Sequence, residues 1–124
     1  GVENCFARHK RNHLALKAGL AALGIGYTAQ EGHQLPMLNA VRIPEGVDDA
    51  AVRGALLNRF GIEIGGGLGP MAGKTWRIGL MGETSTERNV LLFLAALEAC
   101  LVKQGASVRP GSGVAAAIAA RGLN

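Results

Sequence analysis

The chain has 124 residues, of which 48% are hydrophobic and 4% aromatic, and 13 basic against 9 acidic side chains give it a net charge of +4. This length suits one domain with a largely aliphatic core. Its basic residues are scattered and aromatic rings are too few for a base-stacking platform, so we expect no nucleic-acid partner. The most apolar stretch, about 13 residues at 90–102, is shorter than the roughly 20 residues of a membrane span, so we expect no membrane partner either.

Residues 1–23 carry apolar side chains at helical spacing, and Gly24 follows as a stop, so we predict a helix there. The helical pattern is already under way at Gly1, without a cap, which we interpret as a fragment of a longer chain. His9 and His13 have the spacing of a metal-binding pair, but no HExxH glutamate lies between them, and we expect no metal site. Cys5 and Cys100 lie far apart, which favours reduced thiols in a cytoplasmic protein over a disulfide.

The next segment alternates turn residues with short strand patterns. Glycines and a proline punctuate 24–36, which predicts a short edge strand at 27–29 and a loop that contains His33, whose role the sequence does not define. Apolar alternation over 38–43 predicts a second strand, which Pro44 and Gly46 end.

A helix is predicted over 48–60, because Asp48 can cap its first amides and Gly61 can end it. We expect a short strand at 62–64 to follow. The predicted buried stripe of this helix consists of Ala51, Val52, Ala55, Leu56 and Phe60. The scarce large side chains expected in the core are Phe6, Phe60, Trp76 and Phe93.

The most informative stretch is 61–82, GIEIGGGLGPMAGKTWRIGLMG, which joins a glycine-dense turn to a strand. Two nucleotide-binding motifs can be fitted to it imperfectly, but both require a following helix, and here a strand follows. We therefore predict a hairpin connection whose glycines adopt turn conformations or approach a ligand closely. The candidate active-site loop consists of Gly66, Gly67, Leu68 and Gly69.

Residues 75–81 alternate, so that Trp76, Ile78 and Leu80 share the core-facing side of a strand. Arg77 then points away from that core, beside Gly79. A planar guanidinium in this position suits bidentate capture of a carboxylate or phosphate, although a solvated surface arginine would fit the alternation as well. Arg77 is the candidate substrate-binding residue.

Thr84 and Glu87 form a capping-box pattern ahead of a helix that Gly105 closes. Its predicted core side consists of Val90, Leu91, Leu94, Leu97 and Leu101. After a turn at 109–111, an alanine-rich helix at 112–120 offers little packing surface, so we expect a loosely held tail. The fold class is α+β, with a small mixed β-sheet covered mainly on one face by the helices 48–60 and 86–104.

The string LLNRFGIEIGGGLGPMAGKTWRIGLMG at 56–82 resembles the C-terminal domain of class V pyridoxal-phosphate aminotransferases, in particular the alanine-, serine- and ureidoglycine-glyoxylate group. Arg8, His9, the segment LPMLNAVRIPEG and the tail from Val108 resemble it too. The resemblance covers the whole chain but only the last third or so of such an enzyme. It implies a linker helix at 1–24, the small domain of a fold-type I enzyme at 25–105 and a C-terminal tail with a short helix at 106–124.

In the family that the chain resembles, the small domain contributes the arginine that holds the substrate carboxylate, and the WRIGLMG match makes Arg77 that residue. The substrates implied are a small amino acid, alanine or serine, and the 2-oxo acid glyoxylate. Pyridoxal phosphate would be held by the large domain, because none of Lys10, Lys17, Lys74 and Lys103 lies in a segment similar to the cofactor-lysine region. We thus expect no cofactor in this chain alone, no activity of it alone, and a homodimer for the full-length enzyme. A non-catalytic anion-binding or dimerisation module is the alternative.

Overall fold

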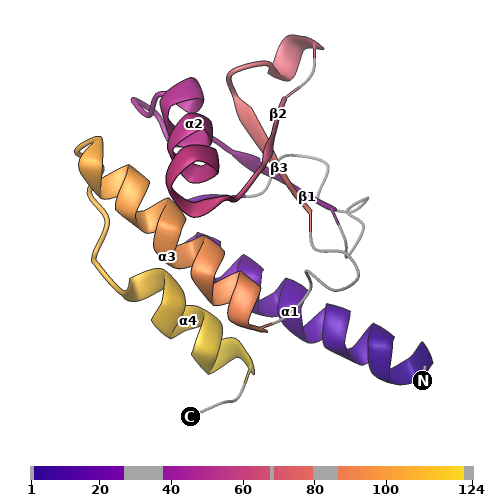
Figure 1. The fold of residues 1–124 in the computed structure, drawn as a ribbon. Helices are drawn as coiled ribbons and strands as arrows, with labels where there is room; N and C mark the ends of the chain where they lie inside the picture. Colours follow the sequence, from indigo (N-terminus) through magenta and orange to yellow (C-terminus); the bar gives the residue numbers. More distant parts are fainter. Residues whose placement is uncertain (1, 27–37, 68, 80–86, 122–124) are drawn as a thin grey trace.

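The computed structural model describes residues 2–26, 38–67, 69–79 and 87–121 (Figure 1). Four helices and three strands succeed one another along these residues. In chain order they are α1 (Val2–Ala22), β1 (Leu38–Arg42), α2 (Asp49–Phe60), β2 (Gly65–Gly66), β3 (Thr75–Gly79), α3 (Glu87–Lys103) and α4 (Ser112–Arg121). The predicted α+β class is confirmed.

The sheet has the order β1-β3-β2, and both pairs of neighbouring strands are antiparallel. A mixed sheet was expected from the sequence. β1 and β2 do run in the same direction, but β3 lies between them and runs the opposite way. The described strands therefore contain no parallel pair.

Local capping residues fix the helix ends as the sequence predicted. The Asp48 carboxylate accepts a hydrogen bond from the Ala51 amide at 3.1 Å, and Gly61 ends α2 in the left-handed conformation at φ 66°. Gly24 and Gly105 have φ of 80° and 84° after α1 and α3. The predicted strand at 62–64 is wrong, because the Ile62 amide donates to the Leu56 carbonyl at 3.0 Å as part of the α2 cap. Pairing begins only at Gly65.

The hydrophobic core lies between the helices and the Trp76 face of the sheet. Trp76 is fully buried and Phe93 is 5% exposed, as predicted, whereas Phe60 is 39% exposed and Ala51 also faces solvent. A helix of 3.6 residues per turn cannot bury five positions across so wide an arc when one neighbour, α3, covers it. The fully buried aliphatic residues of the core are Leu16, Leu20, Val41, Val52, Leu56, Val90, Leu94, Leu97 and Leu101.

Helices α1, α3 and α4 lie side by side as a layer below the sheet in Figure 1. A methyl group at Gly19 would lie 2.9 Å from the Gly113 carbonyl oxygen and would overlap a Leu94 methyl. At Gly113 it would lie 3.0 Å from Leu23. α4 is thus packed closely on α1, which corrects the expectation of a loosely held tail.

Several predictions concern residues outside the described part of the chain. These are the strand at 27–29, the loop with His33, Leu68, the last residues of the Arg77 strand and the cap at Thr84, together with the side chains of Cys5, Phe6, Arg8 and His9. Within the described residues, no helix combines the length and the apolar character needed to cross a bilayer. The same residues contain no cluster of three or more histidine, cysteine or acidic side chains suited to a metal.

Candidate functional site

Arg77 occupies the middle of the central strand β3. Its neighbours Trp76 and Ile78 are 0% and 3% exposed on the core face, and Arg77, partly buried, lies on the opposite face. In the two ladders Arg77 pairs with Ala40 of β1 and with Gly65 of β2. The predicted alternation is confirmed for these residues, and the two residues that flank Arg77 across the sheet, Ala40 and Gly65, are both small.

The Arg77 side chain is held by β2. Its Nε donates a hydrogen bond to the Gly66 carbonyl at 2.8 Å. A methyl group at Gly65 would lie 3.1 to 3.3 Å from the guanidinium, so the bare glycine lets the guanidinium lie against the strand. Within the described part of the chain no carboxylate pairs with Arg77 and its two terminal nitrogens have no partner. That end of the fork can bind a carboxylate in bidentate fashion.

The glycines that follow shape the turn. A methyl group at Gly67 would lie 2.7 Å from the Met71 carbonyl carbon, and Gly69 has a φ of 55° at the start of the 3-10 turn Gly69–Met71. The predicted hairpin thus forms, with Gly66 as the acceptor for Arg77. Gly65 was not among the predicted loop residues, although its place opposite Arg77 in a short hairpin was the signal that could have identified it.

A second polar cluster lies on the core face beside Arg77. Asp49, the first residue of α2, accepts hydrogen bonds from Trp76 Nε1 at 2.8 Å and from Arg53 Nε and Nη2 at 2.8 and 3.1 Å. The bonds from Arg53 lower the pKa of the Asp49 carboxyl, outweighing partial burial, and Trp76 lowers it further. The same contact raises the pKa of Arg53. The sequence analysis missed this cluster, because its partners Asp49 and Trp76 are 27 residues apart.

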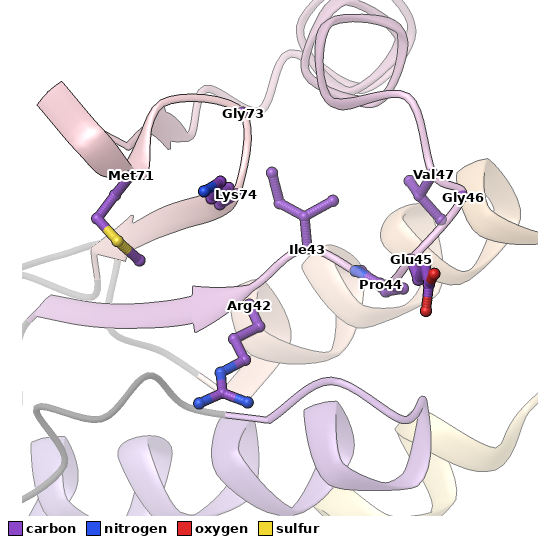
Figure 2. Close-up of a pocket in the computed structure, with 9 residues that line it drawn as sticks. All are labelled: Arg42, Ile43, Pro44, Glu45, Gly46, Val47, Met71, Gly73 and Lys74. Atoms are coloured by element: carbon purple, nitrogen blue, oxygen red, sulfur yellow. The ribbon is translucent and has the colours of Figure 1, made fainter.

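Three hollows are lined by described residues. The largest, 440 Å³, lies between the end of β1 and the turn before β3; Ile43 projects into it, whereas the Arg42 guanidinium points away from Lys74 and Met71 (Figure 2). The others, 250 and 280 Å³, lie along α2. Arg77 lines none of the three.

The described residues do not form a cradle for a cofactor with a ring and a phosphate. Lys74 lines the 440 Å³ hollow, but no aromatic side chain lines it, and Lys10 and Lys103 are exposed on helices. Cys100 is a free thiol 6% exposed in α3, and burial raises its pKa against the opposite effect of Arg59 and Lys103. What this arrangement can do chemically is bind an anion at Arg77.

Comparison with known proteins gives consistent results. No family model matches the chain. The chain is 42% identical over 118 residues to the (S)-ureidoglycine-glyoxylate transaminase of Bacillus subtilis, covering 95% of this chain and 28% of that protein. It is 41% identical over 102 residues to the alanine-glyoxylate aminotransferase of Callithrix jacchus, covering 82% of this chain and 25% of that protein.

The crystal structure of the ureidoglycine-glyoxylate aminotransferase from Bacillus subtilis superposes with a TM-score of 0.91, covering 97% of this chain and 31% of that one. The chain thus spans less than a third of the length of the relatives that it matches. Over nearly its whole length it is similar to the C-terminal portion of class V aminotransferases. Several of these relatives are named for transfer to glyoxylate, and the chain is also 36% identical over 120 residues to the pyridoxamine-pyruvate transaminase of Mesorhizobium japonicum, covering 96% of this chain and 30% of that protein.

Proposed function

We propose that this chain is the part of a pyridoxal-phosphate-dependent aminotransferase that binds the substrate carboxylate, and that Arg77 is the residue that does so. The supporting observation is the Arg77 side chain itself, anchored through Nε to Gly66, while no carboxylate in the described part of the chain pairs with its terminal nitrogens. The intact protein would transfer an amino group from alanine or serine to glyoxylate. Both kinds of substrate carry a carboxylate next to the reacting carbon.

Arg77 acts by orientation. A guanidinium that binds both carboxylate oxygens fixes the position and the plane of the substrate, which lowers the entropic cost of reaching the reactive geometry. In this role Arg77 positions the substrate and transfers no proton. The relatives imply that the intact protein uses pyridoxal phosphate. We place that cofactor outside this chain.

The test is Arg77→Ala in the intact protein. A charge-assisted hydrogen bond contributes roughly 1.5 to 3 kcal/mol, so we expect kcat/KM for alanine and glyoxylate to fall about 10- to 150-fold. Arg77→Lys should recover little of this, because an ammonium lacks the planar fork.

Arg42→Ala is the matched control, since Arg42 is an exposed arginine that pairs with Thr75 and so lies on the same sheet face. It should leave kcat/KM nearly unchanged. Near-normal kcat/KM in Arg77→Ala, or an equal loss in both variants, would contradict the proposed role.

We propose further that α1 links this domain to a preceding large domain and that the intact protein is a cytoplasmic homodimer. The resemblance supports both parts, and the free buried thiol of Cys100 accords with a reducing compartment. Sedimentation of the intact protein at several concentrations tests the dimer, and a single monomeric species would overturn it.

A further inference from the structure

The two-residue strand β2 lies between two arginines. Gly65 pairs with Arg77 and Gly66 with Trp76, so the two glycines face opposite sides of the sheet. On one side the Arg77 guanidinium lies against Gly65, within 3.1 Å of where a methyl group would stand. On the other side the Arg53 guanidinium lies against Gly66, within 3.5 Å of the corresponding position. Arg53 thus contacts β2 on the face opposite Arg77. It does so at Gly66, the residue whose carbonyl accepts the hydrogen bond from Arg77.

Asp49 is hydrogen-bonded both to Arg53, which lies against β2, and to Trp76 of β3. It holds Arg53 through two hydrogen bonds at 2.8 and 3.1 Å, which orients the guanidinium toward Gly66. It also accepts the Trp76 indole hydrogen at 2.8 Å, which fixes the residue next to Arg77 in β3. The Asp49 side chain is 17% exposed and that of Arg53 38%, so the pair is partly shielded from water.

We propose that Asp49 is a positioning residue for Arg77, acting through Arg53 on β2 and through Trp76 on β3. This inference rests on the proposed function, in which Arg77 binds the substrate carboxylate. The physical reason is the weakness of β2 alone. Two glycines form the shortest of strands and have the greatest backbone freedom of any residue, so the Gly66 carbonyl needs external support to stay in place. A misplacement of a fraction of an ångström in that acceptor would turn the Arg77 fork away from its ligand.

The ordinary alternative is that Asp49 and Arg53 form only a helical ion pair at i, i+4 spacing. Such a pair would affect the stability of α2 and leave substrate binding unchanged. A helical ion pair explains neither the hydrogen bond from Trp76 to Asp49 nor the contact of Arg53 with Gly66.

The experiment uses the intact protein with alanine and glyoxylate as substrates. Asp49→Asn keeps an oxygen for Trp76 but sets an amide NH₂ against the Arg53 Nη2, which breaks the two-point contact. We expect KM for alanine to rise roughly 3- to 10-fold while kcat changes little. Trp76→Phe removes the indole hydrogen-bond donor, together with part of the ring volume at this buried position, and should shift KM in the same direction. Asp49→Glu should restore part of the loss.

Asp48→Asn is the matched control, because Asp48 is the adjacent carboxylate, contacts the Ala51 amide and not Arg53 or Trp76, and asparagine caps helices equally well. It should leave KM unchanged. In an Arg77→Ala background, Asp49→Asn should have no further effect on KM, since the residue that it positions is gone.

The outcomes separate the two claims. If Arg77→Ala leaves KM and kcat/KM near normal, the proposed function fails and this inference fails with it. If Arg77→Ala is damaging but Asp49→Asn and Trp76→Phe leave KM unchanged, the positioning role is overturned while the proposed function stands. An equal rise of KM from Asp49→Asn with and without Arg77 would likewise overturn it. Should Asp49→Asn fail to fold, Trp76→Phe and Arg53→Lys decide the same question.

Discussion

Glycines permit close approach in two regions of this molecule, with different consequences. In the helical layer, Gly19 and Gly113 let the backbones of α1 and α4 come together and leave room for Leu94. In the hairpin, Gly65 and Gly66 let two guanidinium groups lie against β2. The first contact is between apolar surfaces and stabilises the fold. The second holds a charged group, so its loss would alter binding rather than stability.

The largest effect that separates the two regions is expected from Gly19→Ala. The added methyl group would lie 2.9 Å from the Gly113 carbonyl, a backbone atom that cannot rotate away. We expect the free energy of unfolding to fall by about 1 to 3 kcal/mol, as for other overpacked sites. Urea unfolding followed by far-UV circular dichroism measures it.

Gly54→Ala is the matched control, since Gly54 lies inside α2 and nothing is within 4 Å of the added group. It should stabilise the chain by roughly 0.5 to 1 kcal/mol, because alanine loses less backbone entropy in a helix. A neutral Gly19→Ala would contradict the packing that we assign to the helical layer, and a destabilising Gly54→Ala would contradict the open space that we assign beside Gly54 in α2.

A comparison of Gly65→Ala with Gly66→Ala tests how much substrate binding depends on the close approach of Arg77 to β2. The first methyl group would lie 3.1 Å from Arg77 Nη2, so the guanidinium must move, whereas the second would make an ordinary 3.5 Å contact with Arg53. In the intact protein we expect Gly65→Ala to raise KM for alanine by roughly 3- to 10-fold, with unfolding free energy almost unchanged. Gly66→Ala should change KM by less than about 2-fold. Equal effects on KM would show that the close approach of Arg77 to Gly65 is unimportant.

The smallest effect concerns pH. Hydrogen bonds from Arg53 and Trp76 lower the pKa of the Asp49 carboxyl below the ordinary 3.8 of an aspartate, so on acidification the unfolded chain takes up a proton there before the folded chain does. The stabilisation is therefore complete above pH 3.8 and is lost as the pH falls through the lower, folded value. We expect the difference in unfolding free energy between the protein and Asp49→Asn to be constant from pH 5 to 8 and to shrink in more acidic solution. A difference that grows on acidification would contradict the assigned shift.

Local signals predicted the helices well, because each is a short-range interaction. Asp48 reaches an amide three residues on, Gly61 and Gly105 supply the left-handed conformation that ends a helix, and alternation places Trp76 and Arg77 on opposite faces of one strand. The site residue Arg77 was identified from that alternation together with the family resemblance. Its role in binding remains a proposal with a test.

Long-range pairing explains where prediction was wrong. The isoleucines at 62 and 64 look like a strand, but the α2 cap takes the Ile62 amide, and only Gly65 and Gly66 reach β3. Phe60 looked like a core residue, yet its side chain is 39% exposed. Neither outcome can be derived from the residues nearby, because each depends on which distant segment occupies the space.

By itself the sequence determined the element types, the helix ends and the face on which Arg77 stands, since these follow from backbone geometry and contacts within a few residues. The tertiary structure alone decided that β3 lies between β1 and β2, that α4 packs closely on α1 through Gly19 and Gly113, and that Asp49 meets Trp76. The physical reason is that these contacts join residues far apart in the chain, and their geometry exists only once the whole core has packed.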